Sequence, residues 1–131
     1  MATIFSKIIS GDIPCYKICE DELFFAFLDI NPVAKGHTLI VPKKEVDYIF
    51  DLDDALLSKM MIFAKRVGKA IEKTIPCNRV GISIIGLEVP HAHMHLMPIQ
   101  KLHDMSFEKE RLSFTADEYE DIAKSITANF A

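Results

Sequence analysis

The stretch His91-Ala92-His93-Met94-His95-Leu96-Met97-Pro98 decides how the rest of this sequence is interpreted. Three histidines alternate with apolar residues, and the stretch ends at a proline. Because successive side chains of a β-strand leave opposite faces of a sheet, this alternation predicts a strand with three imidazoles on one face and a core on the other. Neighbouring imidazoles of a regular strand lie about 6–7 Å apart. Imidazole titrates near neutral pH, so such a row can hold a proton donor and a nucleophile.

The composition predicts one ordinary globular domain over residues 1–131. The net charge of −4 and pI near 5.7 give no basis for binding nucleic acid. The three cysteines, Cys15, Cys19 and Cys77, form no CxxC pair, which is typical of a reducing compartment. No apolar run reaches the ~20 residues of a membrane span, and Met1-Ala2-Thr3 lacks the basic start of a secretory signal. We therefore expect a cytoplasmic protein that binds neither nucleic acid nor a membrane.

Three helices are predicted from apolar spacing and capping residues. Apolar residues at helical spacing over 4–9, followed by Gly11, indicate a short opening helix. Apolar residues recur at intervals of three and four from about Asp54 to Thr74, where the longest helix is expected. A capping box at residues 115–118 begins a C-terminal helix.

Strands are predicted between these helices. Residues 16–19 and 23–28 form a hairpin around an acidic turn, and residues 37–42 and 80–85 are further β-branched or apolar runs. The histidine strand is predicted over Val89–Met97, and residues 102–113 as a polar loop over one edge. Together these elements predict an α+β fold whose mainly antiparallel sheet has about five strands.

Three interpretations of the histidines remain open from the residues alone. They could be solvated side chains on an exposed sheet face. An HxH pair could hold zinc, although no Cys, Asp or Glu follows at a spacing that completes a tetrahedral site. A neutral imidazole could instead attack phosphorus while a second imidazole donates to the leaving group. His37, a further histidine directly after Gly36, would by itself be a turn residue with a solvated ring.

The sequence resembles the histidine triad (HIT) family, and its Hint-like branch most closely. The run 91–97 resembles the family's His-φ-His-φ-His-φ-φ signature, where φ is apolar. The segments 4–14, 25–32 and 36–43 resemble the family's opening segment, its base-and-ribose segment and its next strand. The resemblance covers residues 3–98 and implies a HIT-like fold in a homodimer, for which the long helix is a reasonable contact.

The resemblance also implies a hydrolase or transferase acting at the α-phosphorus of purine nucleoside monophosphate derivatives, such as phosphoramidates and acyl- or aminoacyl-adenylates. His93 would form a nucleotidyl-histidine intermediate. His95 would contact the phosphate and the leaving group, while His91 and His37 orient the nucleophile. Two alternatives remain: a dinucleoside polyphosphate hydrolase, and a non-catalytic nucleotide-binding interaction module.

Eight further residues are assigned to nucleotide binding by the same resemblance. Asp29 would accept hydrogen bonds from the ribose hydroxyls, and an apolar wall would hold the base. Glu88 replaces a serine that faces the phosphate in relatives, so either it turns away and offers its backbone N–H, which we favour, or it faces a cationic leaving group. No cofactor and no metal are expected, because Thr3 and Ser6 stand where zinc-containing relatives have Cys-x-x-Cys. The remaining assigned residues are Ile8, Ile13, Phe27 and Ile30 for the base, and Gly86 and Val89 for the phosphate side.

Overall fold

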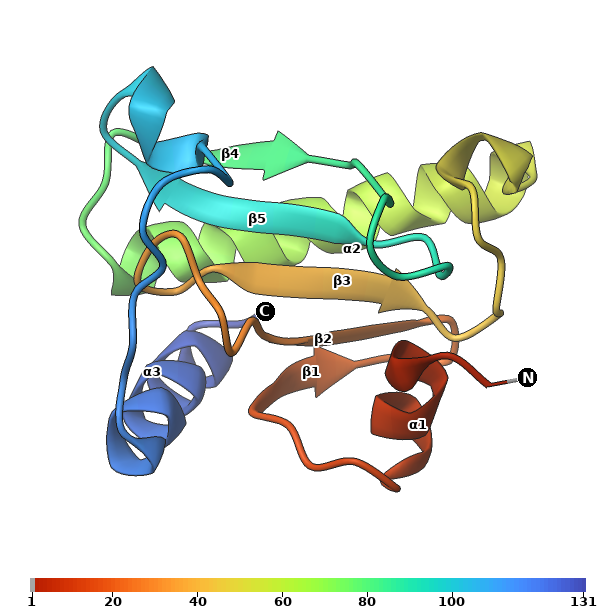
Figure 1. Cartoon of the computed structure of the whole chain (residues 1–131), viewed down its shortest axis with the longest axis horizontal. Coiled ribbons are helices and arrows are strands. Elements are labelled where there is room, and N and C mark those ends of the chain that lie inside the picture. The colour runs from red at the N-terminus through yellow and green to blue at the C-terminus, as the bar shows by residue number, and fades with distance from the viewer. Residues whose placement is uncertain (1) are drawn as a thin grey trace.

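In the computed structural model, which describes residues 2–131, an antiparallel sheet forms the centre of the fold (Figure 1). The strand order is β1-β2-β3-β5-β4, so β4 and β1 are the edges. The prediction of an α+β fold with a five-stranded antiparallel sheet is confirmed. The strands are β1 (Lys17–Glu20), β2 (Phe24–Leu28), β3 (Thr38–Pro42), β4 (Arg79–Ser83) and β5 (Met94–Ile99).

The three predicted helices are present as α1 (Ile4–Ser10), α2 (Asp54–Thr74) and α3 (Ala116–Ala128). Each begins at an N-cap whose side chain accepts a hydrogen bond from a backbone N–H of the first turn, which the helix itself leaves unpaired. Helix α2 has the bounds that the sequence predicts. The N-caps are Thr3, Asp53 and Thr115.

The two faces of the sheet are covered differently. Helix α2 runs along one face, behind β3 and β5 in Figure 1, and α3 packs against β1 and α2. The main core lies on this side and includes Ile40, Met60 and Leu96, all fully buried. A smaller cluster, to which α1 contributes Phe5, lies on the opposite face together with Leu39. His95 pairs with Leu39 across β3 and β5, so it belongs to this second face.

The predicted histidine strand over Val89–Met97 is wrong at its start, because β5 begins at Met94. The preceding residues bond to loops rather than to a neighbouring strand. The His91 N–H donates to the Val89 carbonyl at 2.8 Å, and the Ala92 N–H donates to the Val46 carbonyl at 2.7 Å. Histidines still alternate with other residues through this segment, although it forms no ladder of hydrogen bonds with a neighbouring strand. Sequence periodicity alone cannot distinguish such a segment from a strand.

The other strand predictions differ less from the structure. Strand β4 ends at Ser83 instead of residue 85, and β1, β2 and β3 each begin one residue later than predicted. The predicted loop 102–113 contains one short 3-10 helix, Leu102–Met105. None of the helices within residues 2–131 has the length and apolar character needed to cross a bilayer.

Candidate active site

Four histidines gather on the second face of the sheet and are buried. The exposed fraction is 1% for His37, 0% for His91, 6% for His93 and 8% for His95. The interpretation of these residues as solvated side chains is therefore wrong. Gly36 directly precedes His37, and its φ of 88° lies in the left-handed region that favours glycine.

The ring of His93 is held with one nitrogen free. Its Nδ1 lies 2.8 Å from the His91 carbonyl oxygen, and since a carbonyl only accepts, Nδ1 carries the proton. Nε2 then carries a lone pair and has no hydrogen-bond partner within residues 2–131. The Phe5 ring packs edge-on against His93, with centroids 4.9 Å apart. Burial lowers the pKa of His93, although the hydrogen bond to His91 opposes this shift. His93 is thus a neutral imidazole with an available nucleophilic nitrogen.

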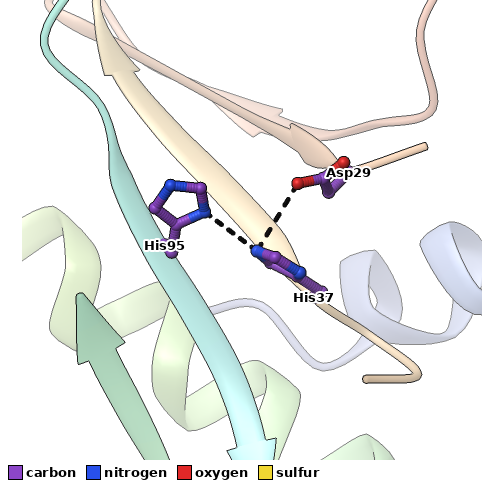
Figure 2. Close-up of side chains that lie close together, drawn as sticks. All are labelled: Asp29, His37 and His95. Atoms are coloured by element: carbon purple, nitrogen blue, oxygen red, sulfur yellow. Dashed lines mark hydrogen bonds and ion pairs between the residues drawn. The ribbon is translucent and has the colours of Figure 1, made fainter. Parts of the chain in front are cut away.

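A chain of two hydrogen bonds fixes the protons on His37 and His95, and Figure 2 shows the bond between the two rings. The Val33 N–H donates to His37 Nδ1 at 3.1 Å, so the proton of a neutral His37 must lie on Nε2. His37 Nε2 in turn lies 2.9 Å from His95 Nδ1 and donates to it. The proton of His95 is therefore on Nε2. The rings of His93 and His95 have centroids 5.0 Å apart, so the two imidazoles are direct neighbours.

Both members of this pair are kept neutral. Burial, together with the nearby charges of Arg111 and Lys109, lowers the pKa of His37 to about 3. Burial also lowers the pKa of His95 to about 3, with His37, His93 and Arg111 contributing in the same direction and Asp29 opposing it. At neutral pH the pair therefore acts through hydrogen bonds rather than as imidazolium cations.

The ring of His91 is bonded at both nitrogens. Nε2 donates to the Pro42 carbonyl at 2.8 Å, so Nδ1 accepts from the Thr3 hydroxyl, also at 2.8 Å. Thr3 is itself the N-cap of α1 and accepts from the Ser6 N–H. Glu45 closes the network by accepting from the Thr3 N–H at 2.8 Å and from the Ser6 hydroxyl at 2.7 Å. The start of α1 is thereby attached to the loop that carries the nucleophile.

Substitution of Thr3 by valine should lower the free energy of unfolding by about 2–3 kcal/mol, because it removes a helix cap and leaves a buried imidazole nitrogen unpaired. Thr115→Val is the matched control, since Thr115 caps α3 without contacting a histidine, and about 1 kcal/mol is expected there. Thr3→Ser should behave as wild type. Urea unfolding measures all three, and equal losses for Thr3→Val and Thr115→Val would contradict the role of the His91 bond.

Asp29, His37 and His95 form a cluster whose potential ligand atoms lie within 4.8 Å of one another. Asp29 Oδ2 is 3.5 Å from His37 Nε2 (Figure 2). A metal on His37 Nε2 would require the proton of a neutral imidazole to move to Nδ1, where it would face the Val33 N–H. The Nδ1–H of His37 and the Val33 N–H would then be two hydrogen-bond donors facing each other in the protein interior, with no acceptor between them. This arrangement suits a hydrogen-bonded pair and opposes a metal site.

The residues predicted to bind nucleotide lie around these histidines but do not form one closed pocket. Phe27 is buried against Phe5, with ring centroids 5.7 Å apart, whereas Ile30 is 73% exposed. Ile8 and Ile13 are half-buried, and Ile8 and Val89 pack against the cluster that contains Phe27. Glu88 is exposed, and its charge raises the pKa of His93 as the weakest of the contributions to it. Gly86 and His93 line a cavity of about 270 Å³ together with Asp47, Tyr48, Ile49, Ile84, Ile85, Leu87 and Ala92.

Three residues at the site escaped prediction from the sequence. Thr3 and Glu45 reach His91 through the network above, and Phe107 packs edge-on against His95, with ring centroids 4.8 Å apart. Only Thr3 had a recognisable signal, because a threonine before an apolar helical run is a typical N-cap. The other two contacts join segments far apart in the chain.

Known proteins match the part of the chain that contains the four buried histidines. The family model described as "HIT domain" matches residues 10–102. An uncharacterized HIT-like protein of Borreliella burgdorferi is 32% identical over 134 residues, which cover 96% of this chain and 96% of that protein. Adenosine 5'-monophosphoramidase HNT1 of Saccharomyces cerevisiae is 42% identical over 98 residues, covering 74% of this chain and 62% of that protein. The crystal structure of a Hit-like protein involved in cell-cycle regulation from Bartonella henselae has a TM-score of 0.85 at 28% identity, covering 98% of this chain and 96% of that one.

Proposed function

The chain belongs to the HIT domain family, and from this premise we propose that it hydrolyses or transfers nucleoside monophosphate groups by breaking a bond at the α-phosphorus. The preferred substrates are phosphoramidates and acyl- or aminoacyl-adenylates. The observation that carries the proposal is the pair of complementary nitrogens on His93 and His95, one with a lone pair and the other with a proton. The similarity to an adenosine 5'-monophosphoramidase supports the same reaction class.

The proposed reaction has two steps. His93 Nε2 attacks the α-phosphorus, so that a nitrogen–phosphorus bond forms and the bond to the leaving group breaks. The leaving atom takes the electron pair of the broken bond and receives the Nε2 proton of His95. Water then attacks phosphorus and returns a proton to His95 Nε2, the bond to His93 breaks with its electron pair going back to Nε2 of His93, and the nucleoside monophosphate is released. Two rigidly held groups suit a reaction governed by positioning and charge stabilisation.

The nucleotide itself is proposed to lie across the ends of β2 and α1. Asp29 follows β2, is only partly exposed and would accept hydrogen bonds from the ribose hydroxyls. The exposed Ile30 and the partly buried Ile8 and Ile13 would contact a purine, with Phe27 as the buried support. The loop holding Gly86, Glu88 and Val89 would approach the phosphate, and we retain the interpretation that Glu88 points away from it.

The test compares an adenosine phosphoramidate with a chromogenic amine against a dinucleoside polyphosphate. We expect faster turnover of the phosphoramidate, a burst of amine equal to the enzyme concentration, and one AMP group on the peptide containing His93 after an alkaline quench. Preference for the dinucleoside polyphosphate would favour the first alternative. AMP binding without any turnover or burst would favour the non-catalytic interaction module and overturn the proposal.

Activity should survive exhaustive treatment with a chelator, because the Val33 N–H bond to His37 opposes metal binding at the Asp29–His37–His95 cluster. The measurement is turnover before and after dialysis against a chelator, with the metal content determined in parallel. Stoichiometric zinc in the purified protein, together with activity that zinc alone restores, would contradict this prediction.

We also propose a homodimer in the cytoplasm, with a purine nucleotide as the small-molecule partner. Strand β4 is an open edge, and Ile82 on it is 40% exposed. Met61 of α2 is 51% exposed and lines the same groove as Ile82, so a second copy would cover both. Within residues 2–131 the three cysteines are free, which suits a reducing compartment.

Sedimentation velocity should show a dimer at micromolar concentration, and Met61→Glu should shift it to a monomer by placing a charge in the covered groove. Leu102→Glu is the control, since Leu102 is 89% exposed and lies beyond β5. A monomeric wild-type protein would overturn the dimer without affecting the proposed chemistry.

A further inference from the structure

Residues 105–112, which we call the strap, connect β5 to α3 across the histidine face of the sheet. The strap begins at Met105, which lies so close to Gly81 of β4 that a Cβ there would meet the Met105 sulfur at 2.5 Å. It ends at Leu112, whose N–H donates to the Pro32 carbonyl at 2.8 Å. Figure 1 shows this segment passing over the end of the sheet where β3 begins. Both ends of the strap are therefore attached to the body of the fold.

Phe107 of the strap covers the hydrogen-bonded histidine pair. Its ring is edge-on to His95 at a centroid distance of 4.8 Å and to His37 at 6.0 Å. Among residues 2–131 the His95 ring makes one hydrogen bond, through Nδ1, which by itself leaves the ring free to rotate. Rotation of the His95 ring is limited by the Phe107 ring and by the His93 ring, whose centroid is 5.0 Å from that of His95.

Arg111 holds Phe107 in place. Its guanidinium carbon lies 5.4 Å from the centroid of the Phe107 ring. One terminal nitrogen donates to the Asn31 carbonyl at 2.6 Å, and the other donates to the Phe107 carbonyl at 3.2 Å. Asn31 belongs to the loop that also carries Asp29 and the Val33 N–H. The strap and the loop that orients His37 are thus joined into one unit.

We infer that Phe107, held by Arg111, is a positioning residue that keeps the His95 ring oriented with its Nε2–H toward the leaving group. The inference rests on the proposed function, because only a donor of fixed direction stabilises a departing atom consistently. It extends the site beyond residues 10–102, which the family model matches. Arg111 has a second effect, since its charge lowers the pKa of both His37 and His95.

The titratable groups whose charges act on the pair come from three segments. Asp29 follows β2, His93 precedes β5, and the strap supplies Lys109 and Arg111. Asp29 opposes the cations in its effect on His95. Phe107 is the strap residue whose side chain packs directly on the rings, so its removal should disturb orientation without changing any charge.

The first measurement is the tautomer of His95 by ¹⁵N NMR without substrate. The wild type should show His95 protonated at Nε2, and Phe107→Ala should show a mixture of the two neutral tautomers. Phe107→Leu, which keeps apolar volume, should give an intermediate result and covers the case in which the alanine variant does not fold. Leu102→Ala is the matched control on the same connection, with an 89% exposed side chain. A single Nε2–H tautomer in both Phe107 variants would overturn the inference.

The second measurement is turnover with adenosine esters or amides of graded leaving-group basicity. Phe107→Ala should slow the most basic leaving groups about tenfold and the least basic less than about twofold, as expected for loss of one aromatic contact to the donor. Arg111→Gln should show the same dependence of turnover on leaving-group basicity, and Arg111→Lys should recover part of the lost turnover. Equal losses across all leaving groups would overturn the positioning role. If the wild type lacks turnover, the proposed function fails, while the tautomer measurement still decides the role of Phe107.

Discussion

The variant His93→Ala should lose at least about a thousandfold in turnover while binding AMP within about tenfold of wild type. The loss follows from the proposed reaction, in which His93 Nε2 forms the bond to phosphorus, because bond formation affects the transition state more than ground-state affinity. Steady-state kinetics measures the turnover, and calorimetric titration measures the affinity for AMP.

The control for this variant is His103→Ala, since His103 is exposed in the short helix after β5. It should turn over substrate as the wild type does. Full activity in His93→Ala, or an AMP adduct that remains after the substitution, would contradict the covalent mechanism. A large loss of AMP affinity would instead indicate that His93 serves mainly to bind the nucleotide.

Acid should unfold this protein with unusual ease, through His37 and His95. In the unfolded chain both titrate near pH 6.5, whereas the folded state holds the pKa of each at about 3. Between these values the unfolded state binds more protons, so stability falls as the pH decreases from 6.5 toward 3. At about pH 4.5 the pair should cost roughly 5 kcal/mol, a large part of a typical domain's stability.

The measurement is the free energy of unfolding from urea titrations between pH 7 and 4.5. His95→Asn should reduce the slope against pH relative to wild type, because one of the buried bases is gone. Leu102→Ala, at an 89% exposed position without a titratable group, should leave the slope unchanged. Since the slope reports proton uptake, the comparison stays valid even where a variant is less stable overall. A wild-type slope near zero would show that the pair is already protonated in the folded state.

Local signals in the sequence predicted most of the fold. The capping residues Gly11 and Thr115 and the spacing of apolar residues in α2 act within a few residues of the chain, so the helix positions could be found without the structure. The histidine strand was placed too early, because alternation at residues 89–93 comes from a loop bonded to Val46 and not from a ladder.

The site shows the same division between local and distant effects. The triad could be singled out from its pattern, whereas His37 was assigned to the site only through the resemblance to the HIT family. The structure brings His37 and His95 within one hydrogen bond. The contacts that define the protons on the rings could not be predicted. Thr3 lies 88 residues from His91, and the strap that carries Phe107 was only a polar loop in the sequence. Such pairs are fixed by topology, which no local pattern encodes.

The tautomers of the site histidines depend mainly on the backbone. The His91 carbonyl sets the proton on His93, the Pro42 carbonyl sets that on His91, and the Val33 N–H sets those on His37 and, through it, His95. Peptide groups are the same in every residue, so the side chains at positions 33 and 42 can diverge during evolution without altering the chemistry. Proline at position 33 is an exception, because it has no N–H to donate. The proton arrangement therefore depends on the path of the backbone. Sequences of low identity that preserve this path can preserve the same arrangement.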